Sequence, residues 1–175
     1  NAAQSHDINT AEMLEAPRVP TDVGQTIGEA VHHLRELLAN RDIELIRRLD
    51  EGVMVRAGRG MLELVVQNVL ENAISFSPAG RTVAVTLTAK DDTAELQIDD
   101  EGPGIEPGTI DHVFERYFSS RPGGAESSTE VAGHSGLGLW IVRRNVEALG
   151  GQVSAANRPG GGLSVVIVLP RNGHR

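Results

Sequence analysis

The stretch GMLELVVQNVLENAISF, residues 60 to 76, decides the fold class, because its apolar side chains recur with the period of an α-helix. They fall at i, i+3, i+4, i+7, i+8, i+11 and i+12, which predicts a helix with one fully buried face. Asn68, Asn72 and Ser75 lie about 120° or more from the centre of this face. The apolar residues are Leu62, Val65, Val66, Val69, Leu70, Ala73 and Ile74.

The two asparagines, one helical turn apart, need a reason beyond folding. Asparagine is a mediocre helix former, since its amide competes for backbone hydrogen bonds. Its neutral carbonyl oxygen suits a hard cation such as Mg²⁺, and its amide N–H groups can donate to phosphate oxygens. The alternative is that this strip is only the solvated side of the helix.

The remaining periodicities predict an α+β fold with helices layered on one face of a mostly antiparallel sheet. Residues 82–89 and 93–99 alternate apolar and polar and form an antiparallel hairpin. A helix of about 18 residues begins with Thr21 or Asp22 as its N-cap. Further predicted elements are strands at 43–49, 53–56, 152–157 and 163–170, a short helical segment near 110–116 and a helix at 137–151.

Length and composition favour one domain cut from a longer protein. The chain has 175 residues, starts at Asn1, contains no cysteine and lacks a stretch long enough to span a membrane. Its net charge of −8 argues against general nucleic-acid binding. Residues 1–20 are predicted to be a linker or the end of an upstream helix, and residues 119–136, without periodicity, a lid or disordered loop.

Two glycine-rich segments carry possible ligand chemistry. Asp100, Gly102 and Gly104 follow a strand, where a carboxylate can accept a hydrogen bond from an exocyclic amine and glycines let the backbone approach a flat ring. In GHSGLGLW, residues 133–140, glycines lead into a helix N-terminus, whose amides can cradle an anion without net positive charge. Each segment alone is also consistent with an ordinary turn.

Together, in this order, the segments resemble the five sequence boxes of the catalytic ATP-binding domain of sensor histidine kinases. The resemblance covers about residues 21–170 and implies the GHKL, or Bergerat, fold, a two-layer α/β sandwich with ATP held under a flexible lid. We therefore expect the domain to span residues 21–172. The matching segments are Asn68-x-x-x-Asn72, Asp100-x-Gly102-x-Gly104, VFERYF at 113–118, GHSGLGL at 133–139 and GGGLSVVIVLP at 160–170.

The resemblance implies ATP and Mg²⁺ as cofactors and assigns a role to each matching residue. Asn72 would ligate the metal, Asp100 would bind the adenine amine, and Asn68 and Arg116 would act in phosphoryl transfer. The residues implied in ATP binding are Asn68, Asn72, Phe76, Asp100, Gly102, Gly104, Ile105, Tyr117, Arg121, Ser135, Gly136, Leu137, Gly138 and Leu139.

One position separates this chain from the hydrolytic members of the superfamily, such as type II topoisomerases. Those ATPases carry a glutamate four residues before the metal-binding asparagine, where it acts as general base. Asn68 occupies that position here and cannot accept a proton, so the pocket should hold ATP without efficient hydrolysis. The chain also departs from the kinases, which often have Lys-Tyr where it has Ser75 and Phe76.

The resemblance also implies partners that the sequence does not contain. Ser5, His6 and Asp7 resemble the phosphoacceptor motif, but Pro17 and Pro20 follow too soon for the acceptor hairpin, so this segment is predicted to be a linker. The acceptor histidine would lie on an upstream dimerisation domain of the same protein, and a response regulator would receive the phosphate. We expect a monomeric cytoplasmic fragment of a homodimeric protein anchored in a bacterial inner membrane. A non-catalytic regulatory module and an anti-sigma-factor-type serine kinase remain as alternatives.

Overall fold

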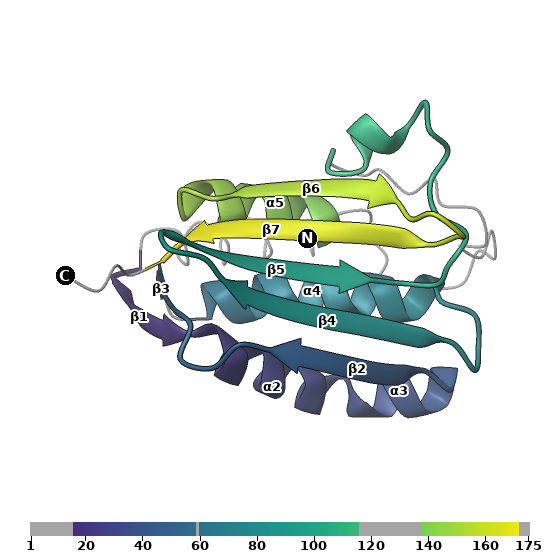
Figure 1. Cartoon of the computed structure of the whole chain (residues 1–175), viewed down its shortest axis with the longest axis horizontal. Coiled ribbons are helices and arrows are strands. Elements are labelled where there is room, and N and C mark those ends of the chain that lie inside the picture. The colour runs from purple at the N-terminus through teal and green to yellow at the C-terminus, as the bar shows by residue number, and fades with distance from the viewer. Residues whose placement is uncertain (1–15, 59, 116–137, 172–175) are drawn as a thin grey trace, which may run out of the picture.

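A five-stranded sheet with helices on one face forms the body of the protein (Figure 1). The structure is a computed structural model that describes residues 16–58, 60–115 and 138–171. The sheet has the order β2-β4-β5-β7-β6, and a separate two-stranded sheet pairs β1 with β3. The elements are β1 (Arg18–Asp22), α2 (Val23–His33), α3 (Arg35–Arg41), β2 (Glu44–Leu49), β3 (Met54–Gly58), α4 (Met61–Phe76), β4 (Thr82–Ala89), β5 (Thr93–Asp99), the 3₁₀ turn η1 (Ile110–His112), α5 (Gly138–Ala148), β6 (Gln152–Asn157) and β7 (Leu163–Pro170).

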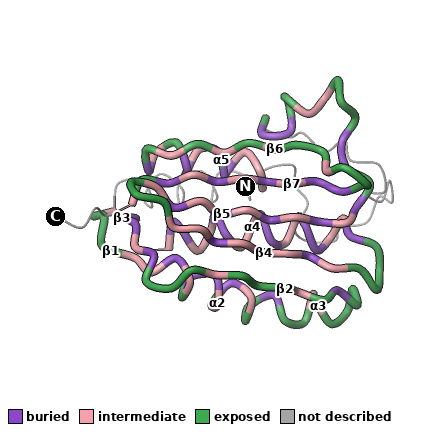
Figure 2. The backbone as a smooth tube through the Cα atoms, viewed as in Figure 1, coloured by how far each residue is buried: buried purple, intermediate pink, exposed green. Residues whose placement is uncertain are grey.

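The predicted fold class is confirmed. β2 pairs with β4 in parallel, whereas β4–β5, β5–β7 and β7–β6 are antiparallel, so the sheet is mixed and mostly antiparallel. Burial alternates along the central strands (Figure 2). Val85 and Ile167 are buried under the helices, whereas Gln97 on the opposite face is half-exposed. This alternation explains the two layers, because only one sheet face has enough apolar side chains to bury.

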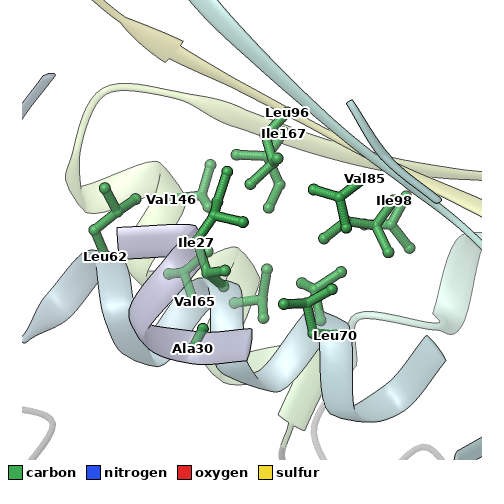
Figure 3. Close-up of a cluster of buried hydrophobic side chains, with 14 of the residues drawn as sticks. Ile27, Ala30, Leu62, Val65, Leu70, Val85, Leu96, Ile98, Val146 and Ile167 are labelled. Atoms are coloured by element: carbon green, nitrogen blue, oxygen red, sulfur yellow. The ribbon is translucent and has the colours of Figure 1, made fainter. Parts of the chain in front are cut away.

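Helix α4 occupies the centre of the helical layer. All seven residues of its predicted apolar stripe are buried, and they pack among side chains from α2, α5 and the sheet (Figure 3). Ile27 and Ala30 come from α2, Val146 from α5, and Leu96 from β5. The helix thus joins every part of the core and orients its polar strip toward α5.

The first predicted helix is broken in two, which the sequence pattern does not indicate. Asp22 is the N-cap, as predicted, and its side chain accepts a hydrogen bond from the backbone N–H of Gln25. At Leu34, where φ is −91° and ψ is 6°, α2 ends and α3 begins. After this change of direction Arg41 donates to the carbonyl oxygens of Ser75 and Ser77 at 2.6 and 3.2 Å, satisfying groups at the C-terminal end of α4.

The N-terminal strand β1 was also not anticipated. The sequence predicts a linker as far as residue 20, whereas residues 18–20 form part of a strand that pairs antiparallel with β3. Val19 is 48% exposed and Pro20 interrupts the pattern, so backbone pairing rather than apolar burial defines this strand. Strands β2 and β3, predicted around a common turn, consequently belong to different sheets.

Asn145 is a buried polar residue whose side-chain amide lacks hydrogen-bond partners among the described residues. It lies on the inner face of α5 with no exposed surface, and within the described part of the chain neither its Oδ1 nor its Nδ2 has a hydrogen-bond partner. An unsatisfied buried amide costs about 1–3 kcal/mol. We therefore predict that Asn145→Leu, a change of similar volume, raises the free energy of unfolding by about 1–3 kcal/mol in urea denaturation.

The exposed Asn40 of α3 offers the matched control, since Asn40→Leu should change the free energy of unfolding by less than about 0.5 kcal/mol. A loss of stability in Asn145→Leu would show that the buried amide is satisfied in solution.

Candidate functional site

The polar strip of α4 faces the N-terminal end of α5. Asn68 is half-buried, and its Nδ2 donates to the carbonyl oxygen of Leu64 at 2.7 Å. This bond orients Oδ1 toward α5, where a Cβ built on Gly138 would lie 3.5 Å from that oxygen. Asn68 therefore lies directly beside the first residue of α5, whose helix dipole favours negative charge.

Asn72 is the more available of the two amides. It is half-buried one turn further along the same helix, and its side chain makes no hydrogen bond to any residue within the described part of the chain. Within that part, no group of three or more His, Cys, Asp or Glu side chains could hold a metal. A neutral amide oxygen fits Mg²⁺ bound mainly through phosphates and water, because this ion keeps several waters and takes few protein ligands.

Asp100 is fixed at the end of β5. Its side chain is buried, and Oδ1 accepts hydrogen bonds from the backbone N–H groups of Gly102 at 2.9 Å and Leu163 at 3.0 Å. Its own backbone N–H donates to the carbonyl oxygen of Leu163 at 2.9 Å. Since a carboxylate has about four lone-pair sites, Asp100 can accept a further bond from a ligand.

Close backbone contacts shape the loop that follows. Gly104 has φ of +73°, and a Cβ there would lie 2.6 Å from Oδ1 of Asn157. Gly162, in the turn before β7, has φ of +97°, and a Cβ there would lie 1.9 Å from the carbonyl oxygen of Asp100. Both positions need glycine, for conformation and for space. The predicted site residues included Gly104, whereas Gly162 appeared only within the matching segment 160–170, with no role assigned to it.

The structure shows two groups of predicted residues, Asn68 beside Gly138 and Asp100 with the glycine loop that follows it. Ile105 is buried beside the Asp100 loop, Phe76 ends α4 half-buried, and Leu139 lies in the first turn of α5. The predicted lid and the predicted residues Arg116, Tyr117, Arg121, Ser135, Gly136 and Leu137 lie outside the described residues.

Sequence reasoning missed two residues beside this loop. Asn157 bonds to Ile105 through both side-chain atoms, and Nη1 of Arg158 donates to the carbonyl oxygen of Asp100 at 2.7 Å. Their position ahead of Pro159 and a run of three glycines was the available signal, and it does not reveal which residues they contact.

The outer face of α5 carries a separate hollow of about 410 Å³ that contains neither asparagine of α4. The guanidinium of Arg144 lies 5.3 Å from the ring centre of Trp140, a cation–π contact. Nearby, the hydrogen bond and negative charge of Glu115 raise the pKa of the exposed His112. The hollow is lined by Phe114, Glu115, Trp140, Arg143, Arg144 and Glu147.

Comparison with known proteins identifies sensor histidine kinases as relatives of this chain. Residues 58–173 match the family described as histidine kinase-, DNA gyrase B- and HSP90-like ATPase. The chain is 30% identical over 157 residues to the signal transduction histidine-protein kinase BaeS of Escherichia coli, covering 90% of this chain and 33% of that protein. It is 41% identical over 130 residues to the sensor protein QseC of Salmonella typhi, covering 74% and 26%.

Solved structures of histidine kinases have the same fold as this chain. A mycobacterial sensor histidine kinase, MprB, superposes with a TM-score of 0.75 at 34% identity, covering 90% of this chain and 99% of that one. The catalytic domain of the histidine kinase ThkA has the same TM-score at 19% identity, covering 90% and 99%, and supports the fold alone. The chain spans between 33% and 40% of the length of the first curated relatives.

The contact between Gly162 and Asp100 leads to a test of the site's architecture. Gly162→Ala should lower the free energy of unfolding by about 3 kcal/mol or more, because the new Cβ would displace the Asp100 backbone. Urea denaturation of the purified chain measures this change.

Gly160 in the same turn is the matched control. It also has a positive φ, +87°, but a Cβ added there would have no atom within 4 Å of it. Gly160→Ala should therefore cost only the backbone strain of about 1–2 kcal/mol. Equal losses in the two variants would contradict the steric role of Gly162.

Proposed function

Since the chain belongs to the histidine kinase-, DNA gyrase B- and HSP90-like ATPase family, we propose that it holds Mg²⁺-ATP between α4, α5 and the loop after β5. It is the ATP-binding catalytic domain of a sensor histidine kinase. The γ-phosphate of the bound nucleotide is donated to a histidine on an upstream domain of the same protein.

The observation that carries this proposal is the amide at position 68. Asn68 uses its Nδ2 to bond Leu64 at 2.7 Å and presents Oδ1 beside α5. A neutral amide cannot take a proton from water, so the site lacks at this position the general base on which the hydrolytic relatives depend. The bound triphosphate is thereby kept for a different nucleophile.

The chain's own residues would bind and orient the nucleotide. Asp100 accepts a hydrogen bond from the adenine amine, and the positive φ of Gly104 lets the loop approach the ring. Asn72 would supply an amide oxygen to Mg²⁺, and the ion would offset phosphate charge. Gly138 opens α5, whose N-terminal backbone amides face the phosphates. Positioning thus provides most of the catalysis, as is general for phosphoryl transfer.

The proposed function also needs a phosphoacceptor domain and a response regulator. The lengths of the relatives support a longer protein that contains the first of these. The relatives are sensor kinases two and a half to three times as long as the stretch matched here, which supports an upstream dimerisation domain carrying the acceptor histidine. A response regulator then receives the phosphate on an aspartate. The described helices include none that is long and apolar enough to cross a bilayer. We propose that a membrane anchor lies outside this chain and that the domain works on the cytoplasmic side.

Loss of the carboxylate at position 100 tests the nucleotide site. Asp100→Asn should weaken Mg²⁺-ATP binding about 10- to 100-fold, because a hydrogen bond to a charged group is worth about 1.5–3 kcal/mol. Isothermal titration of the purified chain, with and without Mg²⁺, measures the change.

Asp99→Asn provides the matched control, since the neighbouring carboxylate lies half-buried on the outer sheet face and bonds to Gln97. It should leave ATP affinity within about twofold of the wild type. A failure of the wild-type chain to bind ATP would exclude the kinase function.

Phosphotransfer in trans tests the choice of nucleophile. The chain alone should hydrolyse ATP slowly, and addition of the upstream domain of its own full-length protein should produce acid-labile phosphohistidine. Asn72→Ala should slow phosphotransfer about 10-fold or more, since metal-orienting residues typically contribute 10- to 100-fold. Rapid hydrolysis by the isolated chain would contradict the role assigned to Asn68.

A further inference from the structure

Asn157, the last residue of β6, forms hydrogen bonds with the loop after β5, which runs from Asp100 to Ile105. The two bonded residues, Asn157 and Ile105, are 52 positions apart in the sequence. Its Oδ1 accepts a hydrogen bond from the backbone N–H of Ile105 at 2.8 Å, and its Nδ2 donates to the carbonyl oxygen of the same residue at 2.6 Å. Two bonds of opposite sense to one residue reproduce the pairing that a neighbouring β-strand would provide. They fix both the position and the orientation of Ile105.

The same side chain also sets the distance between the loop and the sheet. Oδ1 of Asn157 lies 2.6 Å from the position of a Cβ on Gly104, so the loop backbone packs directly against the amide. Arg158, the next residue, donates from Nη1 to the carbonyl oxygen of Asp100 at 2.7 Å. The loop from Asp100 to Ile105 is therefore held at both ends by two consecutive residues.

Core packing does not explain these contacts. Asn157 is exposed and lies at the end of β6, the edge strand of the sheet, where apolar burial contributes little. These bonds connect the β6–β7 turn to the loop, and Glu101 of the same loop also accepts a hydrogen bond from the backbone N–H of Thr82 at the start of β4. Their effect is local, and it falls on the residues assigned to the adenine.

We infer that Asn157 is a positioning residue for base recognition, holding Gly104 and Ile105 so that the Asp100 carboxylate faces the adenine amine. The inference rests on the proposed function. Asn157 does not touch the nucleotide; it acts through the loop. Arg158 supports the same loop through the Asp100 carbonyl.

Base discrimination is the measurement that separates positioning from general stabilisation. Dissociation constants for Mg²⁺-ATP and for Mg²⁺-inosine triphosphate, which has a carbonyl in place of the adenine amine, are measured on the 175-residue chain. Asn157→Ala removes both hydrogen bonds to Ile105. Because it acts on the nucleotide only through the loop, it should weaken ATP binding about 3- to 10-fold and weaken inosine triphosphate binding less than about twofold. The preference for ATP therefore falls.

Asn157→Asp separates the effect of the hydrogen bond donated to Ile105 from the effect of losing side-chain volume. It is nearly isosteric and can still accept from the Ile105 N–H, but it cannot donate to the Ile105 carbonyl oxygen and places a negative charge beside it, so it should also lower the ATP preference. Gln152→Ala, at the exposed opposite end of β6, is the control and should keep the wild-type preference.

The outcomes distinguish this inference from the proposed function. Asp100→Asn serves as the reference for complete loss of base discrimination. If the wild type binds ATP and Asp100→Asn loses the preference while both Asn157 variants retain it, the role of Asn157 is overturned and the proposed function stands. If the wild type does not bind ATP, the proposed function fails and this inference fails with it.

Discussion

The burial of one face of α4 is the constraint on which the rest of the structure depends. Its apolar stripe contacts α2, α5 and the sheet, and each fully buried Val, Leu or Ile contributes roughly 1.5–3 kcal/mol. Because these contacts fix the rotation of the helix about its axis, they also fix where its opposite face points. Asn68 is held beside α5 by the core beneath α4 and by its own hydrogen bond to the Leu64 carbonyl oxygen, and Asn72 lies one turn further along the same helix.

The second half of the site depends on the sheet. Asp100 ends β5, and its carboxylate is held by the backbone of β7, the neighbouring antiparallel strand. The Gly-rich turn between β6 and β7 packs on the same residue, so closely that Gly162 has no space for a side chain. In the proposed function the helical layer would supply the amides for metal and phosphate, and the sheet would supply the carboxylate for the base. This division would let an acidic chain bind an anionic nucleotide through backbone amides and neutral side chains.

Periodic patterns predicted the fold well, because buried positions take apolar residues at the spacing of the helix or strand that contains them. The stripe of α4, the hairpin β4–β5 and the closing strands β6 and β7 all follow from apolar spacing, and each was confirmed. The break at Leu34 and the strand β1 were not predicted. Leu34 is as apolar as its neighbours, and Val19 is exposed, so neither position carries a hydrophobic signal for what the backbone does there.

By itself the sequence determined the fold class and the family, and it predicted which residues would face the nucleotide, since these depend on side-chain type at fixed local spacing. Only the tertiary structure decided what holds those residues in place. Asn157 and Arg158 lie more than fifty positions from the loop they bond, and no local pattern records that approach. Long-range hydrogen bonds depend on the pairing of β5 with β7 and of β7 with β6, which brings the β6–β7 turn over the loop after β5. Pairing of this kind is a property of the folded sheet rather than of any single segment.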